Sequence, residues 1–385
     1  MKAIHFGGGN IGRGFIGEVL NQNDFTIAFV DVNHEIIETL NEKKSYTIHL
    51  AEEGGKMIEV DRVYGINNST NPEEVVQLFK ETDLVTTAIG PKILPYIAPL
   101  IAQGIRERRT ANVSKPLDVI ACENMIGGSS FLKNEVVKHL NEADIEYAEQ
   151  YIGFPNAAVD RIVPAQTHED VLSVTVEPYK EWVVEKSGLK NIDLVLNGVD
   201  YVDDLDPFIE RKLFTVNTGH AATAYNGKYA GYQMIDEALK DETVLKEVKR
   251  VLSETGELMV NKWQFNAKEH QQYIEKILNR FKNPFISDDI ARVGRTPMRK
   301  LGYDERFIKP LREAYSRQLS IDALVETIAK AFVYRDEKDE ESQELSRLLT
   351  EKETVDVIRQ VTSLTDEELI NKILTAYQEL LQNDK

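Results

Sequence analysis

Cysteine is nearly absent from this sequence: its 385 residues include one, Cys122. A single thiol excludes an intrachain disulfide and a zinc site built from several cysteines. The seven histidines are scattered, and none has the His-x-x-x-His spacing of paired metal ligands. The sequence therefore predicts a protein that binds no metal, in which Cys122 only packs in a core.

Long apolar runs and excess positive charge are also missing. No apolar stretch approaches the roughly 20 residues that span a bilayer. Residues 1–6 lead directly into a glycine-rich loop, which leaves no room for a cleavable signal. The net charge of −18 disfavours nucleic acid and anionic membranes as partners, because their phosphates repel an acidic surface. We therefore expect a cytoplasmic protein whose partner is a small molecule.

The first half of the chain alternates short apolar runs with amphipathic stretches. The pattern predicts strands at residues 2–6, 26–30, 84–89, 118–121, 147–151, 171–176 and 182–185, helices at 10–20 and 34–41, and an antiparallel hairpin at 46–50 and 57–63. Such alternation is typical of a mostly parallel sheet that is covered by helices on both faces.

From Pro207 onward nearly every segment has helical periodicity. It predicts helices at residues 208–226, 241–263, 269–281, 321–334, 354–361 and 366–382. The charge-rich stretch at 337–344 is predicted to be a solvated loop or helix face. Because a chain of this length usually forms two domains, we expect an α/β domain at 1–195 and an all-α domain at 196–385.

The turn after the first predicted strand contains Gly-x-Gly-x-x-Gly, and the second strand ends in an acid, Asp31, 19 residues beyond Gly12. The glycines permit a tight turn, close approach of the backbone to a pyrophosphate and close packing of the next helix. A carboxylate at Asp31 accepts hydrogen bonds from the ribose hydroxyls and repels a 2′-phosphate. We therefore predict a Rossmann-type domain that binds NAD through Gly7, Gly9, Asn10, Ile11, Gly12 and Asp31. A structural turn beside a surface aspartate is the alternative.

Three polar residues in the helix predicted at 208–226 can face one side: Lys212, Asn217 and His220. At about 100° per residue, Lys212 and His220 lie closest in azimuth, and Asn217 and His220 are i, i+3 neighbours. We expect Gly219 beside them to allow close approach of substrate or cofactor. Alcohol oxidation needs a base and donors to the developing alkoxide, and a buried lysine and an amide can supply these. Spacing alone also allows a purely structural interpretation, in which Lys212 is a solvated surface charge and Asn217 or His220 caps a helix or fills a core.

Several segments together resemble the polyol-specific long-chain dehydrogenases, the mannitol dehydrogenase family. Residues 212–220, Lys-Leu-Phe-Thr-Val-Asn-Thr-Gly-His, resemble the catalytic signature of that family. Ala-Cys-Glu-Asn-Met at 121–125 and Ala-Val-Asp-Arg-Ile-Val-Pro at 158–164 resemble two further signatures. The loop at 9–17 with the lone Asp31 resembles the branch that acts on phosphorylated mannitol, and the likeness extends to residues 292–297.

The resemblance implies NAD-dependent, metal-independent hydride transfer that interconverts D-mannitol 1-phosphate and D-fructose 6-phosphate. Lys212 would be the general base in oxidation and the general acid in reduction. Asn124 and Asn217 would form the oxyanion hole, and His220 would orient the substrate. The resemblance also implies a monomer, because the second domain supplies the catalytic helix within the same chain. We expect residues 159–161 to brace the domain junction through a buried ion pair.

A sugar phosphate needs positive charge, and four basic residues fall within nine positions that contain no acid: Arg292, Arg295, Arg299 and Lys300. The planar fork of arginine suits phosphate oxygens, and the spacing of Arg292 and Lys300 resembles a substrate-contacting pair of the family. We predict that these four residues bind substrate and that Arg295 or Arg299 holds the phosphate. An interdomain charge network or a solvated loop is the alternative.

Two other functions stay open at this point. A sister branch of the family would act on free mannitol, as a mannitol 2-dehydrogenase, or on a hexuronate such as fructuronate or tagaturonate. A non-catalytic NAD(H)-binding sensor would belong to another class. The set of Lys212, Asn124, Asn217 and His220 argues against a sensor, which needs no base beside an oxyanion hole.

Overall fold

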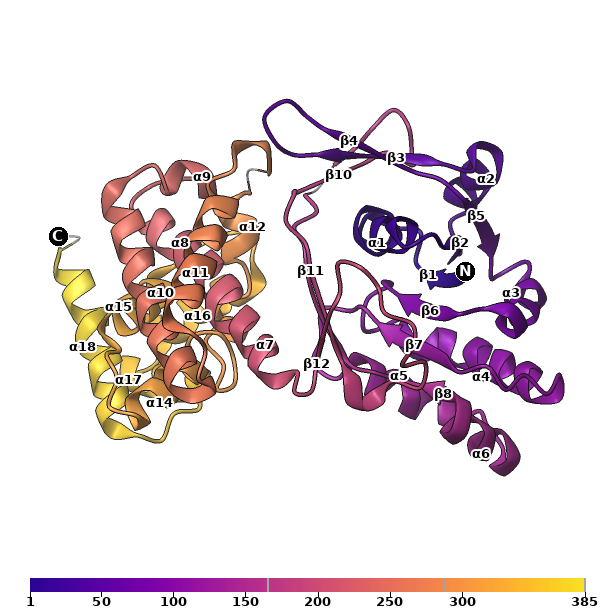
Figure 1. The fold of residues 1–385 in the computed structure, drawn as a ribbon. Coiled ribbons are helices and arrows are strands. Elements are labelled where there is room, and N and C mark those ends of the chain that lie inside the picture. Colours follow the sequence, from indigo (N-terminus) through magenta and orange to yellow (C-terminus); the bar gives the residue numbers. More distant parts are fainter. Residues whose placement is uncertain (165, 287, 384–385) are drawn as a thin grey trace. The chain divides into compact units, whose positions relative to one another are not determined.

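The computed structural model describes residues 1–164, 166–286 and 288–383 (Figure 1). The chain forms two compact units, Met1–Phe208 and Ile209–Lys385. The first unit contains a parallel sheet with helices, and the second is built from helices. The predicted fold class is therefore confirmed.

The N-terminal unit is built around a six-stranded parallel sheet with the order β5-β2-β1-β6-β7-β8. Its strands are β1 (Lys2–Phe6), β2 (Thr26–Asp31), β5 (Val63–Asn67), β6 (Leu84–Thr87), β7 (Leu117–Ala121) and β8 (Ile152–Gly153). Every residue of β6 and β7 is buried, as expected for strands that are covered on both faces.

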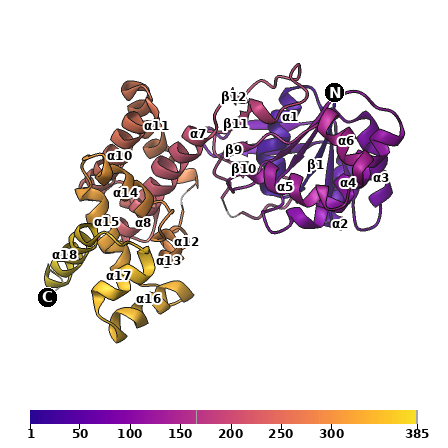
Figure 2. The ribbon, with the colours of Figure 1, turned by 90° about the horizontal axis from the view of Figure 1, so that it is seen from below.

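Helices flank this sheet on both sides (Figure 2). They are the π-helical segment η1 (Gly12–Gly17), α1 (Glu18–Gln22), α2 (His34–Lys43), α3 (Pro72–Leu78), η2 (Phe79–Glu81), α4 (Leu94–Thr110), α5 (Gly128–Val137) and α6 (Glu142–Tyr151). Successive strand residues point to opposite faces. Accordingly, Ala3 and Ile27 belong to one apolar core, and Ile4 and Ala28 belong to the other.

Two three-stranded sheets and the short η3 (Lys186–Gly188) complete this unit. Their strands are β3 (Tyr46–Leu50), β4 (Met57–Val60) and β10 (Val174–Val176) in one, and β9 (Ala157–Asp160), β11 (Glu181–Glu185) and β12 (Asp200–Val202) in the other. The predicted hairpin is confirmed by the antiparallel pairing of β3 with β4. Its second strand, however, ends at Val60. Arg62 adopts a left-handed φ of 54° that turns the chain, and Val63 begins β5 of the main sheet.

The strand predicted at 147–151 is wrong, because these residues form the end of α6. A capping box starts that helix: the Asn141 side chain accepts a hydrogen bond from Asp144 N at 2.9 Å, and Asp144 Oδ2 accepts one from Asn141 N. Two reciprocal caps make the helical start favourable. Only Ile152 and Gly153, which follow the helix, pair with β7.

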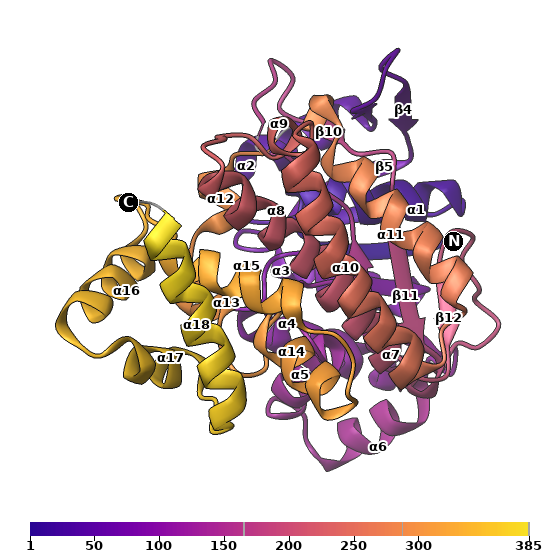
Figure 3. The ribbon, with the colours of Figure 1, turned by 90° about the vertical axis from the view of Figure 1, so that its left-hand side faces the viewer.

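The helical unit confirms the helices that the periodicity predicts. Its elements are α7 (Asp206–Arg211), which begins just before it, the π-helical segment η4 (Lys212–Asn217), α8 (Thr218–Tyr229), α9 (Ile235–Ala238), α10 (Glu242–Trp263), α11 (Ala267–Phe281), η5 (Pro284–Ile286), α12 (Ile290–Gly294), α13 (Pro297–Lys300), α14 (Ile308–Ser316), α15 (Asp322–Val333), α16 (Glu340–Glu351), α17 (Thr354–Thr362) and α18 (Glu367–Asn383). The long helices α10 and α11 pack side by side (Figure 3). Within the described ranges, no helix is long and apolar enough to cross a membrane.

Candidate active site

The glycine-rich loop follows β1 at the carboxyl edge of the main sheet. Gly7 has φ 111°, and a Cβ at this position would lie 2.5 Å from Ala88 O. A Cβ at Gly12 would lie 2.0 Å from Gly7 O, so the turn and the helix start both require glycine. At Gly9, in contrast, a Cβ would meet nothing within 4 Å. The loop therefore leaves an open cradle at the position where the backbone of such a loop approaches a pyrophosphate.

Asp31 ends β2 beside this loop. Its Oδ2 accepts a hydrogen bond from Gly8 N at 2.6 Å, and its Oδ1 accepts one from Asn33 N at 2.9 Å. A carboxylate has about four lone-pair sites, so this partly exposed group can accept further hydrogen bonds from a ribose. Asn10 and Ile11 are exposed on the loop itself. The residues predicted to bind the cofactor thus lie together, and they fit a dinucleotide.

Arg13, which the sequence does not single out, holds this loop in place. Its buried guanidinium donates hydrogen bonds to Gly8 O and, from a distant segment, to Val171 O at 3.0 Å and Leu172 O at 3.1 Å. A buried guanidinium needs such acceptors. No sequence signal identifies carbonyl partners that lie so far along the chain.

The ends of β6 and β7 lie at the same edge of the sheet. The buried carboxylate of Glu123 accepts hydrogen bonds from Thr87 Oγ1 at 2.9 Å, Ile89 N at 3.0 Å and Gly90 N at 2.8 Å. Glu123 thereby ties the two strand ends together and fixes the backbone next to Asn124, which is exposed. Cys122 is buried in the core, where burial raises the pKa of its thiol, so the prediction that it packs is confirmed.

The Val-Asp-Arg segment contains the expected buried ion pair, but the pair lies within the N-terminal unit. Arg161 pairs with Glu18, and both side chains are almost fully buried. Arg161 also donates to Gly14 O at 2.8 Å and to Glu177 O at 2.9 Å. It therefore braces α1 and η1, the helix that follows the glycine loop.

Lys212 and Asn217 are the first and last residues of the π-helical segment η4. In this segment hydrogen bonds join residues five apart, as Thr218 N donates to Leu213 O. A regular α-helix would separate Lys212 and Asn217 by about 140° in azimuth. The wider π-turn advances each residue by a smaller angle, which brings Lys212 and Asn217 closer in azimuth than a regular α-helix would place them. Both are partly exposed.

His220 follows on α8, one turn beyond Asn217. Its ring stacks on Phe281, with 4.7 Å between ring centroids and 11° between planes. Its Nε2 lies 3.6 Å from Asp288 Oδ2. The sequence predicted that Gly219 leaves space for a substrate or cofactor, but in the structure this space is filled by other side chains. A Cβ there would lie 3.0 Å from Leu252 Cδ2 and 3.3 Å from Phe281 Cε2, so this glycine lets α8 pack closely on its neighbours.

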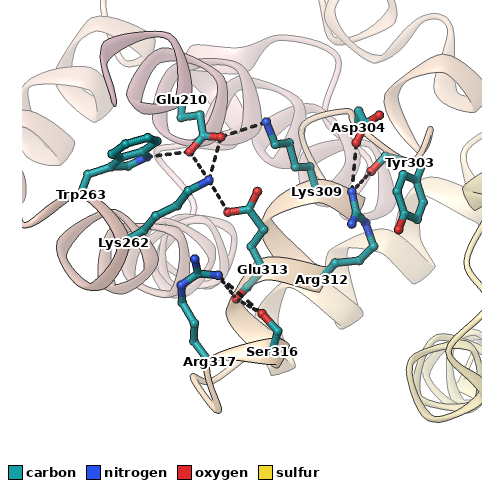
Figure 4. Close-up of polar contacts among 10 residues, drawn as sticks. All are labelled: Glu210, Lys262, Trp263, Tyr303, Asp304, Lys309, Arg312, Glu313, Ser316 and Arg317. Carbon is teal, nitrogen blue, oxygen red and sulfur yellow. Dashed lines mark hydrogen bonds and ion pairs between the residues drawn. The ribbon is translucent and has the colours of Figure 1, made fainter. Parts of the chain in front are cut away.

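Glu210 anchors the helical turn that leads into Lys212. Its carboxylate accepts hydrogen bonds from Trp263 Nε1 at 2.6 Å and from the amines of Lys262 and Lys309 at 2.9 Å (Figure 4). Burial raises the pKa of the Glu210 carboxyl, but these hydrogen bonds outweigh burial and hold that pKa below its usual value. The network fixes the start of η4.

The four predicted substrate-binding residues divide into two groups. Arg292, on α12, pairs with Asp288 through its Nε at 2.5 Å, which raises the pKa of the guanidinium. Arg295, Arg299 and Lys300 lie together around α13. Lys300 Nζ donates to Arg295 O and, at 3.3 Å, to Thr296 Oγ1.

These bases differ in how far they are neutralised. Lys300 is 4 % exposed, and burial together with nearby Arg306 and Arg299 lowers its pKa to about 7. Arg299 forms an ion pair of 3.3 Å with Glu305. Within residues 1–164, 166–286 and 288–383, the exposed guanidinium of Arg295 has no hydrogen-bond or ion-pair partner.

The two units also match known domains. Residues 1–198 match the mannitol dehydrogenase Rossmann domain, and residues 204–381 match the mannitol dehydrogenase C-terminal domain. The chain belongs to the mannitol dehydrogenase family. Over 379 residues, this family member is 56% identical to the mannitol-1-phosphate 5-dehydrogenase of Streptococcus mutans, covering 98% of this chain and 99% of that protein. Over 373 residues it is 57% identical to the enzyme of the same name from Enterococcus faecalis, covering 97% of each.

Two solved structures share the fold of this mannitol dehydrogenase family member. A substrate-free D-sorbitol dehydrogenase superposes with a TM-score of 0.83 at 18% identity, covering 99% of this chain and 93% of that chain. The Pseudomonas fluorescens mannitol 2-dehydrogenase in complex with NAD and D-mannitol superposes with a TM-score of 0.71 at 16% identity, covering 100% and 92%. At these identities the likeness is one of fold.

Proposed function

We propose that this mannitol dehydrogenase family member interconverts D-mannitol 1-phosphate and D-fructose 6-phosphate with NAD. The observation that carries the proposal is the identity of 55–57% to relatives named mannitol-1-phosphate 5-dehydrogenase, over nearly the whole length of both chains. NAD, when bound, takes up the hydride from the alcohol carbon or returns it to the ketone. The open cradle at Gly9 and the carboxylate of Asp31 would hold it.

Lys212 is the proposed acid and base. In oxidation its neutral amine takes the proton from the C5 hydroxyl of mannitol 1-phosphate as that carbon loses a hydride and becomes a carbonyl. In reduction the ammonium returns this proton to the oxygen, so charge and protons balance in both directions. The hydrogen bonds of Glu210 anchor the helical turn that leads into Lys212, which supports a defined backbone position for this residue.

Asn124 and Asn217 are the proposed donors to the oxygen on which negative charge develops. An amide donates without competing for the proton, and the loss of one such donor typically costs about 10²–10³ in kcat. His220, held flat against Phe281, orients the substrate. These roles rest on the motif resemblance together with the local geometry of each residue.

Arg295 is the proposed phosphate ligand. Arg292 and Arg299 already face carboxylates, whereas Arg295 is exposed and its guanidinium has no acidic partner among the described residues. A planar guanidinium binds a phosphate through two parallel hydrogen bonds. We expect Arg295→Ala to raise KM for fructose 6-phosphate about 10-fold or more, and Arg299→Ala to raise it less.

The direct test is to follow NADH absorbance with fructose 6-phosphate, with fructose and with fructuronate, each with and without a chelator. Consumption of NADH with fructose 6-phosphate alone, unaffected by the chelator, is expected. Turnover only with fructose or fructuronate would move the substrate to another branch of the family. NADH binding without any turnover would contradict an enzymatic role and favour a sensor.

The setting of the enzyme is part of the same proposal. We propose that it acts in the cytoplasm as a monomer and without a nucleic-acid partner. The net charge of −18 supports the last of these points, because nucleic-acid phosphates repel an acidic surface. Light scattering on the purified protein should give the mass of one 43.8 kDa chain. A dimer mass would contradict the monomer.

A further inference from the structure

Asp288 lies between two residues of the proposed substrate site. Its Oδ1 accepts a hydrogen bond from Arg292 Nε at 2.5 Å, and its Oδ2 accepts one from the same guanidinium. The same Oδ2 lies 3.6 Å from His220 Nε2. One carboxylate oxygen is therefore shared between an arginine on α12 and a histidine on α8.

The backbone around Asp288 is fixed, so the carboxylate has a defined position. Asp288 O accepts a hydrogen bond from Ile235 N at 2.9 Å, and Ile290 N donates to Gln233 O at 2.9 Å. The side chain of Asp288 is only 10% exposed. A carboxylate with so little access to water depends on its charged partners.

The two partners hold Asp288 unequally. Arg292 makes a two-point contact, which is among the strongest ion pairs that side chains form. The 3.6 Å to His220 is longer than a hydrogen bond but within the range of ion pairing. Stacking on Phe281 sets the plane of the imidazole and leaves its Nε2 edge directed to within this distance of Asp288.

We propose that Asp288 is a positioning residue that couples substrate binding at Arg292 to the orientation of His220. When an anionic or hydroxyl-rich substrate draws the Arg292 guanidinium away, Oδ2 loses its stronger partner and accepts a hydrogen bond from His220 Nε2–H. That bond sets which ring nitrogen carries the proton and holds the opposite nitrogen toward the substrate. The proposal rests on the proposed function in assigning His220 to the substrate. It takes Arg292 as a substrate contact from the sequence-based prediction, separate from the proposed phosphate ligand Arg295.

The test is Asp288→Asn, assayed alone and combined with Arg292→Ala. An amide can neither pair with a guanidinium at two points nor neutralise it. If Asp288 acts through His220, Asp288→Asn lowers kcat about 10- to 100-fold, the equivalent of one hydrogen bond to a charged group. It does so in the wild type and also in the Arg292→Ala background. If Asp288 only neutralises Arg292, the Arg292→Ala background removes the effect, and that outcome overturns the proposal.

A second comparison isolates the histidine. In a His220→Ala background, Asp288→Asn should lower kcat by less than 3-fold, because pairs that act as one unit are non-additive. A full 10-fold loss in that background also overturns the proposal. Asp288→Glu, which keeps the charge, should recover part of the lost kcat and replaces Asp288→Asn if the latter does not fold.

Controls separate this proposal from the proposed function. Asp289→Asn changes the neighbouring exposed carboxylate, which caps α12 through Ala291 N at 2.8 Å, and asparagine caps equally well. It should leave kcat unchanged. NADH titration and thermal unfolding of each variant report cofactor binding and folding. Each variant is assayed with whichever ketose or hexuronate the wild type reduces, so a wrong substrate assignment does not affect the outcome.

Discussion

Two glycines of the cofactor loop should respond in opposite ways to the same added methyl group. In Gly12→Ala the new Cβ would lie 2.0 Å from Gly7 O and 2.7 Å from His5 Nε2. The nearest atom is backbone, so the loop itself must shift. Alanine is favoured over glycine in a helix by about 1 kcal/mol, and overpacking costs about 1–3 kcal/mol or more. We therefore expect a net destabilisation of roughly 2 kcal/mol, or about 4–8 °C in Tm for a unit of this size.

Gly9→Ala adds its methyl group where nothing of the chain lies within 4 Å. Its stability should stay within about 0.5 kcal/mol of the wild type. The methyl group nevertheless enters the space that the loop leaves for a pyrophosphate, so affinity for NADH should fall by about 10-fold or more.

Thermal unfolding and a fluorescence titration with NADH measure both effects on both variants. The reasoning fails if Gly9→Ala binds NADH as tightly as the wild type, because the open position would then not be the cofactor cradle. It also fails if Gly9→Ala loses as much stability as Gly12→Ala. Since the two variants add the same methyl group at positions only three residues apart, each is the control for the other.

Three further predictions concern the helical unit. Lys212→Met should lower kcat by about 10³-fold, the scale of acid–base catalysis, with unchanged NADH affinity; a kcat within tenfold of the wild type would contradict its role. Because the pKa of Glu210 is held low, its stabilisation is present above the unfolded value of 4.5 and is lost as pH falls through the folded value. Glu210→Gln should therefore cost about 1.5–3 kcal/mol at neutral pH, and this cost should shrink as the pH is lowered below 4.5, as measured by Tm across a pH series; a cost that does not change with pH would refute the pairing. Lys300, whose pKa is lowered to about 7, loses its proton as pH rises through neutrality, so KM for fructose 6-phosphate should rise there. Lys300→Met should abolish that rise, and a persisting rise would assign it to another group.

The loop proposed to bind NAD could be recognised from the sequence because its parts are close in the sequence. Gly7, Gly12 and Asp31 belong to one strand–turn–helix–strand unit, and Gly12 is required by Gly7 O within the same loop. Gly7 is required by its positive φ and by Ala88 O, which follows the neighbouring strand β6. The strand predicted at 147–151 failed for a related reason. There the apolar pattern did not distinguish strand from helix, and the capping box at Asn141 decided for α6.

The helix that carries Lys212, Asn217 and His220 was predicted from the sequence, but its local geometry was not. The spacing of Lys212 and Asn217 was interpreted on a regular α-helix, whereas η4 is π-helical. A π-turn inserts one residue per turn and depends on what the helix packs against, which the local sequence does not encode. Gly219 was assigned to the substrate although it serves the packing of α8 on Leu252 and Phe281.

The sequence by itself determined the α/β and helical halves, the dinucleotide loop and the family, because these follow from periodicity and motifs within short segments. Only the tertiary structure decided the charge partners. The acid-free run at 292–300 predicted an unneutralised basic cluster, yet Asp288 and Glu305, just outside it, pair with Arg292 and Arg299. Which base keeps its charge for a ligand depends on how separate helices pack and on the cost of burying an unpaired charge, and neither is written in the order of the residues.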